Sequence, residues 1–390
     1  MKILYCSTLT SNKLLENLSE KIGYPLTSLT IQKFHRLIVK GLVANGCQVD
    51  SVSTSPSVSF FNNAKDDVED GIHYHYITTI ELPLIRHFCI LFGVLFQTIY
   101  WHLKSKEKHF IICDVLNISV CMGAVFSRLF GVKVIGIVTD MPGLMVGIKQ
   151  GLVSTIMKKI NLFLLKRIDA FIFLTEAMNQ PLNPEQKPYI IMEGLVDVDM
   201  QMESRLPNDK YRDVVYAGGI YEKYGLALLI EAFRKVKGDD LRLLLYGRIG
   251  DMPHDMEYYE KLDPRLHYMG IRPNSEIVQE ELQATLLVNP RPSTEEFTKY
   301  SFPSKNMEYM VSGTPVLTMD LPGMPSEYDD NLFICKDESV EGLSSKLNEI
   351  LSLSQEALEN VGSKGKDFVL IHKNNKVQSQ RILNFIYNYF

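Results

Sequence analysis

Short apolar runs alternate with longer stretches of helical periodicity in the first half of the chain. The runs Lys2–Ser7, Gln48–Ser53 and Lys133–Thr139 have the length of buried strands. Between them lie segments with apolar residues at helical spacing, and one such segment, Leu26–Asn45, ends at Gly46, a common helix stop. Because parallel strands need long crossover connections, which are usually helices, this alternation predicts a parallel sheet covered by helices.

The same alternation begins again after about residue 195. Strand-like runs separated by helical segments occur at Asp213–Ala217, Leu241–Tyr246, Ala284–Asn289 and Pro315–Met319. We therefore expect an α/β protein with two Rossmann-like, doubly wound parallel-sheet domains, the first at residues 1–195 and the second at residues 196–376.

The most apolar segment of the chain is Phe88–Trp101, inside a helical pattern over Leu84–Leu103. This segment is shorter than the roughly 20 residues that a membrane-spanning helix needs. We expect a helix buried in the first domain. The alternative is a helix that also touches a membrane surface, because Lys104, Lys106 and Lys108 follow directly.

Composition is that of a globular protein, with 46% of the 390 residues hydrophobic, 22% charged and a formal net charge of −5. These values exclude a disordered chain and argue against a nucleic-acid binder. The charge is unevenly divided, since residues 1–195 carry a net +4 and residues 196–390 a net −9. A basic first half suits an anionic acceptor or lipid headgroups, and an ordinary solvated surface accounts for it equally well.

The six cysteines are scattered and several lie in apolar runs, which predicts buried, reduced thiols in a cytoplasmic protein. No zinc-type spacing of Cys and His is present, so no metal site is expected. His73 and His75 alternate with Tyr74 and Tyr76, a pattern that predicts a strand. Because Met1 leads directly into a strand pattern, we expect no signal peptide.

The strongest local signal is an irregular loop that leads into a helix at about Pro303 and Ser304. Proline is favoured in a first helical turn, and Ser304 can cap it. The first amides of a helix lack partners inside it and bind phosphates, and Lys305 adds positive charge there. Glu308, one turn further on, can accept hydrogen bonds from a ribose diol. A capped amphipathic helix without a ligand would also satisfy this pattern.

From Val214 to Val316 the chain resembles the family 4 glycosyltransferases, which have the GT-B fold and here resemble the type that builds bacterial surface polysaccharides or glycoprotein glycans. The run FPSKNMEYM, residues 302–310, is typical of one subgroup. The resemblance implies two domains that face a cleft, with a last helix at about residues 377–390 that packs back on the first domain. It also implies that Glu308 binds the nucleotide ribose.

The chain departs from the family pattern where the family has a first Glu that contacts the donor sugar. Tyr300 occupies that position. Glu295 and Glu296, a few residues upstream, are the candidates to reach the same space, and we take them as candidate catalytic residues.

A second motif, Gly218-Gly219, follows a strand and lets a ligand approach the backbone closely. Family members generally have Arg at the position of Gly219 and Lys at the position of Tyr224, and these cations neutralise the donor diphosphate. Lys223 is displaced by one position, and Arg248, after the next strand, is a candidate substitute.

A third segment resembles the part of the family that contacts the nucleotide base, which implies contacts from Ile271 or Arg272. In the first domain we expect a long irregular stretch from Ser7 to Ser28, and Gly23 is a candidate for the loop that touches phosphate or acceptor. Asp140 follows a strand and is a candidate acceptor-side or catalytic residue; a helix-capping Asp is the equally good alternative.

These features predict a metal-independent, retaining glycosyltransferase without a cofactor, which moves a hexose or N-acetylhexosamine from a nucleotide sugar, most simply UDP-linked. The expected acceptor is a glycan, a lipid-linked glycan or a glycoprotein. We expect a cytoplasmic protein, with peripheral contact to the inner face of the membrane and a homo-oligomer both compatible with the sequence. The alternatives are a non-catalytic GT-B partner subunit and a nucleotide-sugar 2-epimerase on the same fold.

Overall fold

The computed structural model describes residues 1–23, 26, 30–142, 152–200, 208 and 210–390. The chain forms two compact units. Unit 1 comprises Met1–Leu195 together with Asn374–Phe390, and unit 2 comprises Val196–Lys373. Each is described by itself.

Unit 1 is built on an eight-stranded sheet of order β10-β9-β8-β7-β1-β2-β5-β4. All neighbouring strands are parallel except the edge strand β4, which is antiparallel to β5. The strands are β1 (Lys2–Cys6), β2 (Gln48–Ser53), β4 (Asp67–Glu69), β5 (Ile72–Tyr76), β7 (His109–Asp114), β8 (Val134–Val138), β9 (Ala170–Phe173) and β10 (Tyr189–Ile191). A separate antiparallel pair joins β3 (Phe61–Asn62) to β6 (Thr79–Ile80).

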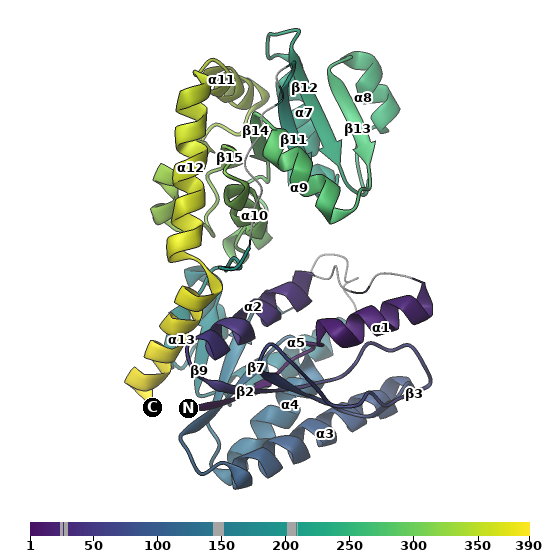
Figure 1. Cartoon of the computed structure of the whole chain (residues 1–390), viewed down its shortest axis with the longest axis vertical. Coiled ribbons are helices and arrows are strands. Elements are labelled where there is room, and N and C mark those ends of the chain that lie inside the picture. Colours follow the sequence, from purple (N-terminus) through teal and green to yellow (C-terminus); the bar gives the residue numbers. More distant parts are fainter. Residues whose placement is uncertain (24–25, 27–29, 143–151, 201–207, 209) are drawn as a thin grey trace. The chain divides into compact units, whose positions relative to one another are not determined.

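Helices cover both faces of this sheet, with α2 and α13 on one face and α3 and α4 on the other (Figure 1). The helices of unit 1 are α1 (Asn12–Ile22), α2 (Thr30–Ala44), α3 (Pro83–Lys104), α4 (Ile118–Phe126), α5 (Leu152–Leu165), α6 (Asn179–Leu182) and α13 (Asn375–Tyr389), with 3₁₀ turns η1 (Ser127–Phe130) and η2 (Glu176–Met178). The doubly wound parallel sheet predicted from the alternation is confirmed for this unit.

The expectation of an irregular stretch from Ser7 to Ser28 is wrong, because this stretch contains α1. The Ser11 side chain accepts a hydrogen bond from the amide of Leu14 and caps the helix. Gly23 ends the helix with a φ of +68°, and its amide donates to the carbonyl of Ser19. The left-handed conformation at Gly23 is thus explained by helix termination.

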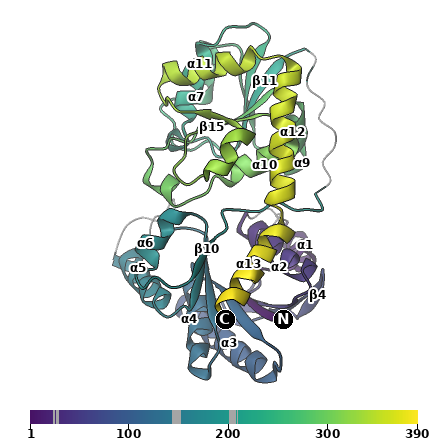
Figure 2. The same cartoon turned by 90° about the vertical axis from the view of Figure 1, so that its left-hand side faces the viewer.

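Helix α13 returns to unit 1 from the far end of the sequence and packs on α2 (Figure 2). Its Ile382, Leu383 and Ile386 belong to the same buried core as β1 and α2. Contact is close because α2 has a glycine there: a Cβ on Gly41 would lie 2.1 Å from the carbonyl oxygen of Asn375. Unit 1 is therefore assembled from two distant parts of the chain.

Helix α3 differs from the expected buried helix. It has 22 residues, and within the described part of the chain it is the one helix whose length and composition would allow it to cross a membrane. The argument that Phe88–Trp101 is too short to span a membrane is therefore wrong, because the helix extends beyond that segment at both ends. Only one face is buried, through Ile90, Val94, Thr98 and Trp101.

Unit 2 has a six-stranded, fully parallel sheet of order β13-β12-β11-β14-β15-β16. The strands are β11 (Arg212–Ala217), β12 (Leu241–Tyr246), β13 (Leu266–Gly270), β14 (Leu286–Asn289), β15 (Val316–Met319) and β16 (Phe333–Cys335). The helices are α7 (Leu226–Arg234), α8 (Met256–Leu262), α9 (Asn274–Gln283), α10 (Ser304–Ser312), α11 (Val340–Leu351) and α12 (Gln355–His372), with 3₁₀ turns η3 (Glu222–Tyr224), η4 (Glu296–Lys299) and η5 (Ser326–Asn331).

Two apolar cores lie on opposite faces of this second sheet, because alternate strand residues point to opposite faces. Val214 and Tyr216 of β11 pack with α7 and α11, whereas Val215 and Ala217 pack with α10. The second predicted α/β domain is confirmed, and the ends of its strands meet at one edge of the sheet.

Candidate donor site in unit 2

Backbone hydrogen bonds join the loops that follow β11, β12 and β13. The amide of Gly218 donates to the carbonyl of Tyr246 over 2.8 Å, and the amide of Gly247 donates to that of Gly270 over 2.9 Å. Gly247 has a φ of +135°, and a Cβ there would lie 1.8 Å from the carbonyl oxygen of Gly218. These three hydrogen-bonded loops form one edge of unit 2, which we call the rim. The rim carries the candidate residues Gly218, Arg248 and Ile271.

The helix start predicted at Pro303 and Ser304 is present, but the expected serine cap is wrong. Pro303 holds the N-cap position and no side chain caps the helix. Ser304 is instead the first helical residue, and it is exposed. Two amides at this start already donate to backbone carbonyls, that of Ser304 to Phe302 over 2.9 Å and that of Asn306 to Pro303 over 2.8 Å. The helix dipole still favours an anion at this end.

Lys305 reaches from this helix start back to the end of β11. Its ammonium donates to the carbonyl oxygen of Ala217 and lies 5.0 Å from the ring centre of Tyr216. A Cβ on Gly218 would lie 2.2 Å from the lysine Nζ. Gly218 is thus the residue that makes room for the Lys305 ammonium.

The surroundings of Lys305 disfavour its charged form when no anion is bound. Burial lowers the pKa of its ammonium, the carboxylates of Glu308 and Glu281 oppose that shift, and the charge of Arg291 adds to it. A dianionic ligand beside Lys305 would reverse the shift by favouring the charged form.

Arg291 is a functional candidate that sequence reasoning missed. It follows β14, and its guanidinium lies 5.3 Å from the ring centre of Phe297 and 5.6 Å from that of Tyr224. Its charge is close enough to lower the pKa of Lys305. The available signal was a cation placed directly after an apolar strand, at the edge where ligands of parallel sheets bind.

Tyr224 contributes its ring to the aromatic cluster beside Arg291. Where the resemblance implies a family lysine, this chain has an aromatic ring that packs edge-on against Tyr221 and Phe297. Lys223 lies over the rings of Tyr221 and Tyr224 at 5.3 and 5.5 Å. A cluster of aromatic rings therefore carries two cations at this edge.

Buried amides hold α10 in place beneath the site. The side-chain amide of Asn289 at the end of β14 donates to Asn306 over 2.7 Å, and Asn306 donates to the hydroxyl of Thr318 over 3.1 Å. Tyr309 receives a hydrogen bond from the amide of Ala217 over 2.8 Å. These hydrogen bonds fix the position of α10. Glu308, one turn after the helix start, is exposed.

Glu295 and Glu296 lie on the segment between β14 and α10. Glu295 is half-buried and directly precedes η4, and Glu296 is exposed in its first turn. The buried hydroxyl of Thr298 donates to the carbonyl of Glu295 over 2.6 Å and fixes the turn. Tyr300 ends the same turn.

The two candidates for base contact lie on the loop after β13. Ile271 is 67% exposed. Arg272 is exposed and donates through Nε to the carbonyl of Met269 over 3.0 Å. Gly270, just before them, turns the chain with a φ of +79°.

The candidates in unit 1 lie at strand and helix ends. Asp140 follows β8, is half-buried, and accepts a hydrogen bond from the amide of Met141 over 2.8 Å. Gly23 lies at the end of α1. Both residues belong to unit 1, whereas the other candidate residues belong to unit 2.

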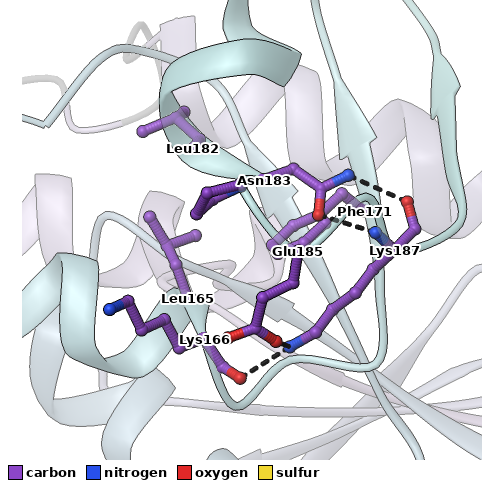
Figure 3. Close-up of a pocket in the computed structure, with 8 residues that line it drawn as sticks. Leu165, Lys166, Phe171, Leu182, Asn183, Glu185 and Lys187 are labelled. Carbon is purple, nitrogen blue, oxygen red and sulfur yellow. Dashed lines mark hydrogen bonds and ion pairs between the residues drawn. The ribbon is translucent and has the colours of Figure 1, made fainter.

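A small pocket in unit 1 is lined by none of these candidates. It is lined by Leu165, Phe171 and Leu182 together with polar residues (Figure 3). The ammonium of Lys187 is already engaged by the Lys166 carbonyl at 2.6 Å and by Glu185 at 3.1 Å. We assign no function to this pocket.

The fold of this chain is that of known GT-B glycosyltransferases. Sucrose-phosphate synthase from Thermosynechococcus elongatus matches all of this chain and 98% of its own, with a TM-score of 0.65 and 14% identity. The lipopolysaccharide outer core galactosyltransferase WaaB matches over the full length of both chains, with a TM-score of 0.60 and 14% identity. HepE from Anabaena, in complex with UDP, matches equally completely, with a TM-score of 0.61 and 13% identity.

Residues 197–368 match the family model described as glycosyl transferases group 1. This match covers nearly all of unit 2, the unit that carries Lys305 and Glu308. A comparison with functionally curated proteins finds no match. The domain match and the fold together indicate a glycosyltransferase.

Proposed function

We propose that this glycosyltransferase is a retaining enzyme of the family 4 type that transfers a hexose or N-acetylhexosamine from a UDP-linked donor. The observation that carries the proposal is the pair of cations at the strand ends of unit 2, with Glu308 one turn along α10. Lys305 donates to the carbonyl of Ala217 after β11, and Arg291, after β14, lies 5.6 Å from the ring centre of Tyr224. Anabaena HepE, a protein of similar fold, is described in complex with UDP.

In this proposal the diphosphate binds at the start of α10. The positive end of the α10 dipole, Lys305 and Arg291 stabilise the negative charge that develops on the departing nucleotide. These cations do the work that a divalent ion does in other enzymes, so we propose a reaction that needs neither metal nor cofactor. Gly218 leaves room for the Lys305 ammonium, and Gly219 leaves room for the ring of Tyr221, at the edge where the phosphates bind.

Glu308 accepts the ribose hydroxyls, and Ile271 and Arg272 contact the base. Glu295 or Glu296 contacts the donor sugar in place of the carboxylate that the family has at Tyr300. Lys223 and Arg248 add positive charge at the rim.

Unit 1 binds the acceptor, a glycan, glycolipid or glycoprotein of a surface-polysaccharide or glycoprotein pathway. Within residues 1–195, 19 Lys and Arg stand against 15 Asp and Glu, and the added segment of α13 carries Lys376 and Arg381 without an acid. This balance favours an anionic acceptor. Asp140 is the proposed acceptor-side polar residue.

Titration with UDP tests the donor site directly. We expect UDP to bind the wild-type protein and Glu308→Ala to lose about 2 kcal/mol, or about thirtyfold in affinity, because a charged hydrogen-bond acceptor is removed. Glu356→Ala is the matched control, since Glu356 is an exposed glutamate in the first turn of another helix of unit 2. Absence of UDP binding, or equal loss in both variants, would refute the donor site.

Tyr300 in the place of a catalytic-site glutamate favours one alternative, a partner subunit that binds nucleotide without turnover. A screen of UDP-sugars for slow hydrolysis, read by NMR, separates the two. Binding of UDP with no hydrolysis or transfer from any sugar would support the partner subunit. Release of the sugar with retained anomeric configuration would support the enzyme, and a C2 epimer in the absence of acceptor would instead indicate an epimerase.

A further inference from the structure

Helix α3 presents an apolar stripe to solvent along its whole length. Residues Leu84, Ile85, Phe88, Phe92, Phe96, Tyr100 and Leu103 are between 42% and 75% exposed. The rings of Phe88, Phe92 and Phe96 stack on one another at successive centroid distances of 6.4 Å. We call these seven residues the α3 stripe.

The α3 stripe forms the solvent-exposed side of the helix. Its residues recur at spacings of three and four, so they share one side of a helix with 3.6 residues per turn. The opposite side packs inward through Ile90, Val94 and Trp101. No Asp, Glu, Lys or Arg occurs between Arg86 and Lys104. A surface helix ordinarily turns charged residues toward water, and between Arg86 and Lys104 this one does not.

Tight packing keeps α3 part of the domain. A Cβ on Gly123 of α4 would lie 2.7 Å from the carbonyl oxygen of Leu91, and a Cβ on Gly93 would lie 2.4 Å from Ile77. Crossing a bilayer would require the helix to leave these contacts and expose Trp101 and its neighbours. The stripe can therefore meet an apolar phase only along its side, over a length of about 33 Å.

Two further exposed apolar residues extend the stripe. Leu129 and Phe130 of η1, which packs against α3, are 85% and 52% exposed. An apolar area made of several adjacent elements marks an interaction surface rather than scattered surface residues.

The charges at the end of the stripe identify the partner. Lys104 ends the helix and Lys106 and Lys108 follow it, all exposed, with Glu107 as the single acid among them. The Lys104 ammonium lies 4.3 Å from the ring centre of Tyr100. Lysine is depleted at protein–protein interfaces, whereas lysines beside aromatic and aliphatic residues of an amphipathic helix are typical of binding to anionic lipid.

We propose that the α3 stripe docks unit 1 on an anionic lipid bilayer. The helix lies in the plane of the interface, the phenylalanines enter the acyl boundary, and the lysines contact lipid phosphates. This proposal does not depend on donor binding, because the stripe and the UDP site lie in different units.

Vesicle flotation of the 390-residue chain tests the proposal. The wild-type protein should float with vesicles of phosphatidylcholine and phosphatidylglycerol, and binding should fall at high salt and on pure phosphatidylcholine. The double variant Phe88→Ser with Phe96→Ser should bind the anionic vesicles about tenfold or more weakly, since two large apolar side chains leave the membrane. UDP affinity should be unchanged in that variant.

The matched control is the double variant Leu353→Ser with Ile371→Ser, which removes two exposed apolar residues of unit 2. It should bind vesicles as the wild type does. Equal binding by the α3 variant, or no binding by the wild type, overturns the proposal. So does a wild-type dimer, seen by light scattering, that the α3 variant converts to monomer, because the stripe would then be an interface between copies.

Discussion

Single glycines decide how closely the parts of the donor site approach. At Gly247 a side chain would meet backbone, the carbonyl oxygen of Gly218, whereas at Gly218 it would meet the end of a flexible lysine. These two positions therefore differ in what a methyl group costs, although both adopt positive φ.

Gly247→Ala should destabilise unit 2 by about 3 kcal/mol, because a backbone clash adds to the cost of a strained φ. Gly270→Ala is the control: its φ is also positive, at +79°, but no atom lies within 4 Å of a Cβ there. Denaturant unfolding followed by far-UV circular dichroism measures both. Equal destabilisation would mean that the contact with Gly218 contributes nothing.

Lys305→Met should lower UDP affinity by about tenfold or more, because it removes a charge-assisted contact to phosphate. The stability of the free protein should change little, since a partly buried cation is replaced by an apolar side chain of similar length. Because burial lowers the pKa of Lys305, wild-type affinity should decline toward alkaline pH before the ordinary lysine range, and the variant should lack that decline. Calorimetric titration across pH provides the measurement.

At the scale of elements, the pairing of β2 with β5 contains a titratable contact. His75 on β5 lies 2.7 Å from Asp66 and 3.4 Å from Asp50 on β2. The hydrogen bond to Asp50 raises the pKa of His75 most, and that to Asp66 adds to it against the effect of burial. The strand predicted from the alternating His and Tyr residues is confirmed, and its histidine joins two strands.

This contact should make unit 1 more stable at mildly acidic than at alkaline pH. A raised pKa in the folded state gives stability that is complete below the unfolded value of about 6.5 and is lost as pH rises through the folded value. His75→Gln should flatten this dependence in unfolding experiments between mildly acidic and alkaline pH. His73→Gln, an exposed histidine on the same strand, should leave it intact.

At the scale of the whole molecule, one unit is continuous in sequence and the other is not. Unit 2 is a single run, Val196–Lys373, whereas unit 1 needs α13 from beyond it. The only tryptophan, Trp101, is buried in unit 1, so its fluorescence reports the unfolding of that unit.

Gly41→Ala should shift the tryptophan transition to lower denaturant, with a loss of about 2 kcal/mol or more, because the methyl group meets the backbone of α13. Gly365→Ala, which meets the Asn331 carbonyl oxygen at 2.7 Å in unit 2, should leave that transition in place. An unchanged transition in Gly41→Ala would show that α13 contributes no stability to unit 1.

Much of the architecture could be predicted because strand and helix periodicity is local. Runs such as Asp213–Ala217 and Leu241–Tyr246 became β11 and β12 with ends within one residue. Helix α1 was missed because its signals, Ser11 as cap and Gly23 as stop, flank a short and weakly apolar stretch. The Ser304 cap was mistaken because Pro303, which cannot donate and has no side-chain acceptor, took the N-cap position.

The sequence by itself determined two doubly wound domains and a helix start that carries Lys305 and Glu308, because hydrophobic period and short motifs are properties of neighbouring residues. Tertiary structure decided that Arg291 lies with Lys305, that Gly218 accommodates the lysine, and that one side of α3 faces solvent. Those outcomes depend on which loops close on one another and which helix face finds a partner. They are set by packing between residues far apart in the chain, which the pattern of neighbouring residues does not predict.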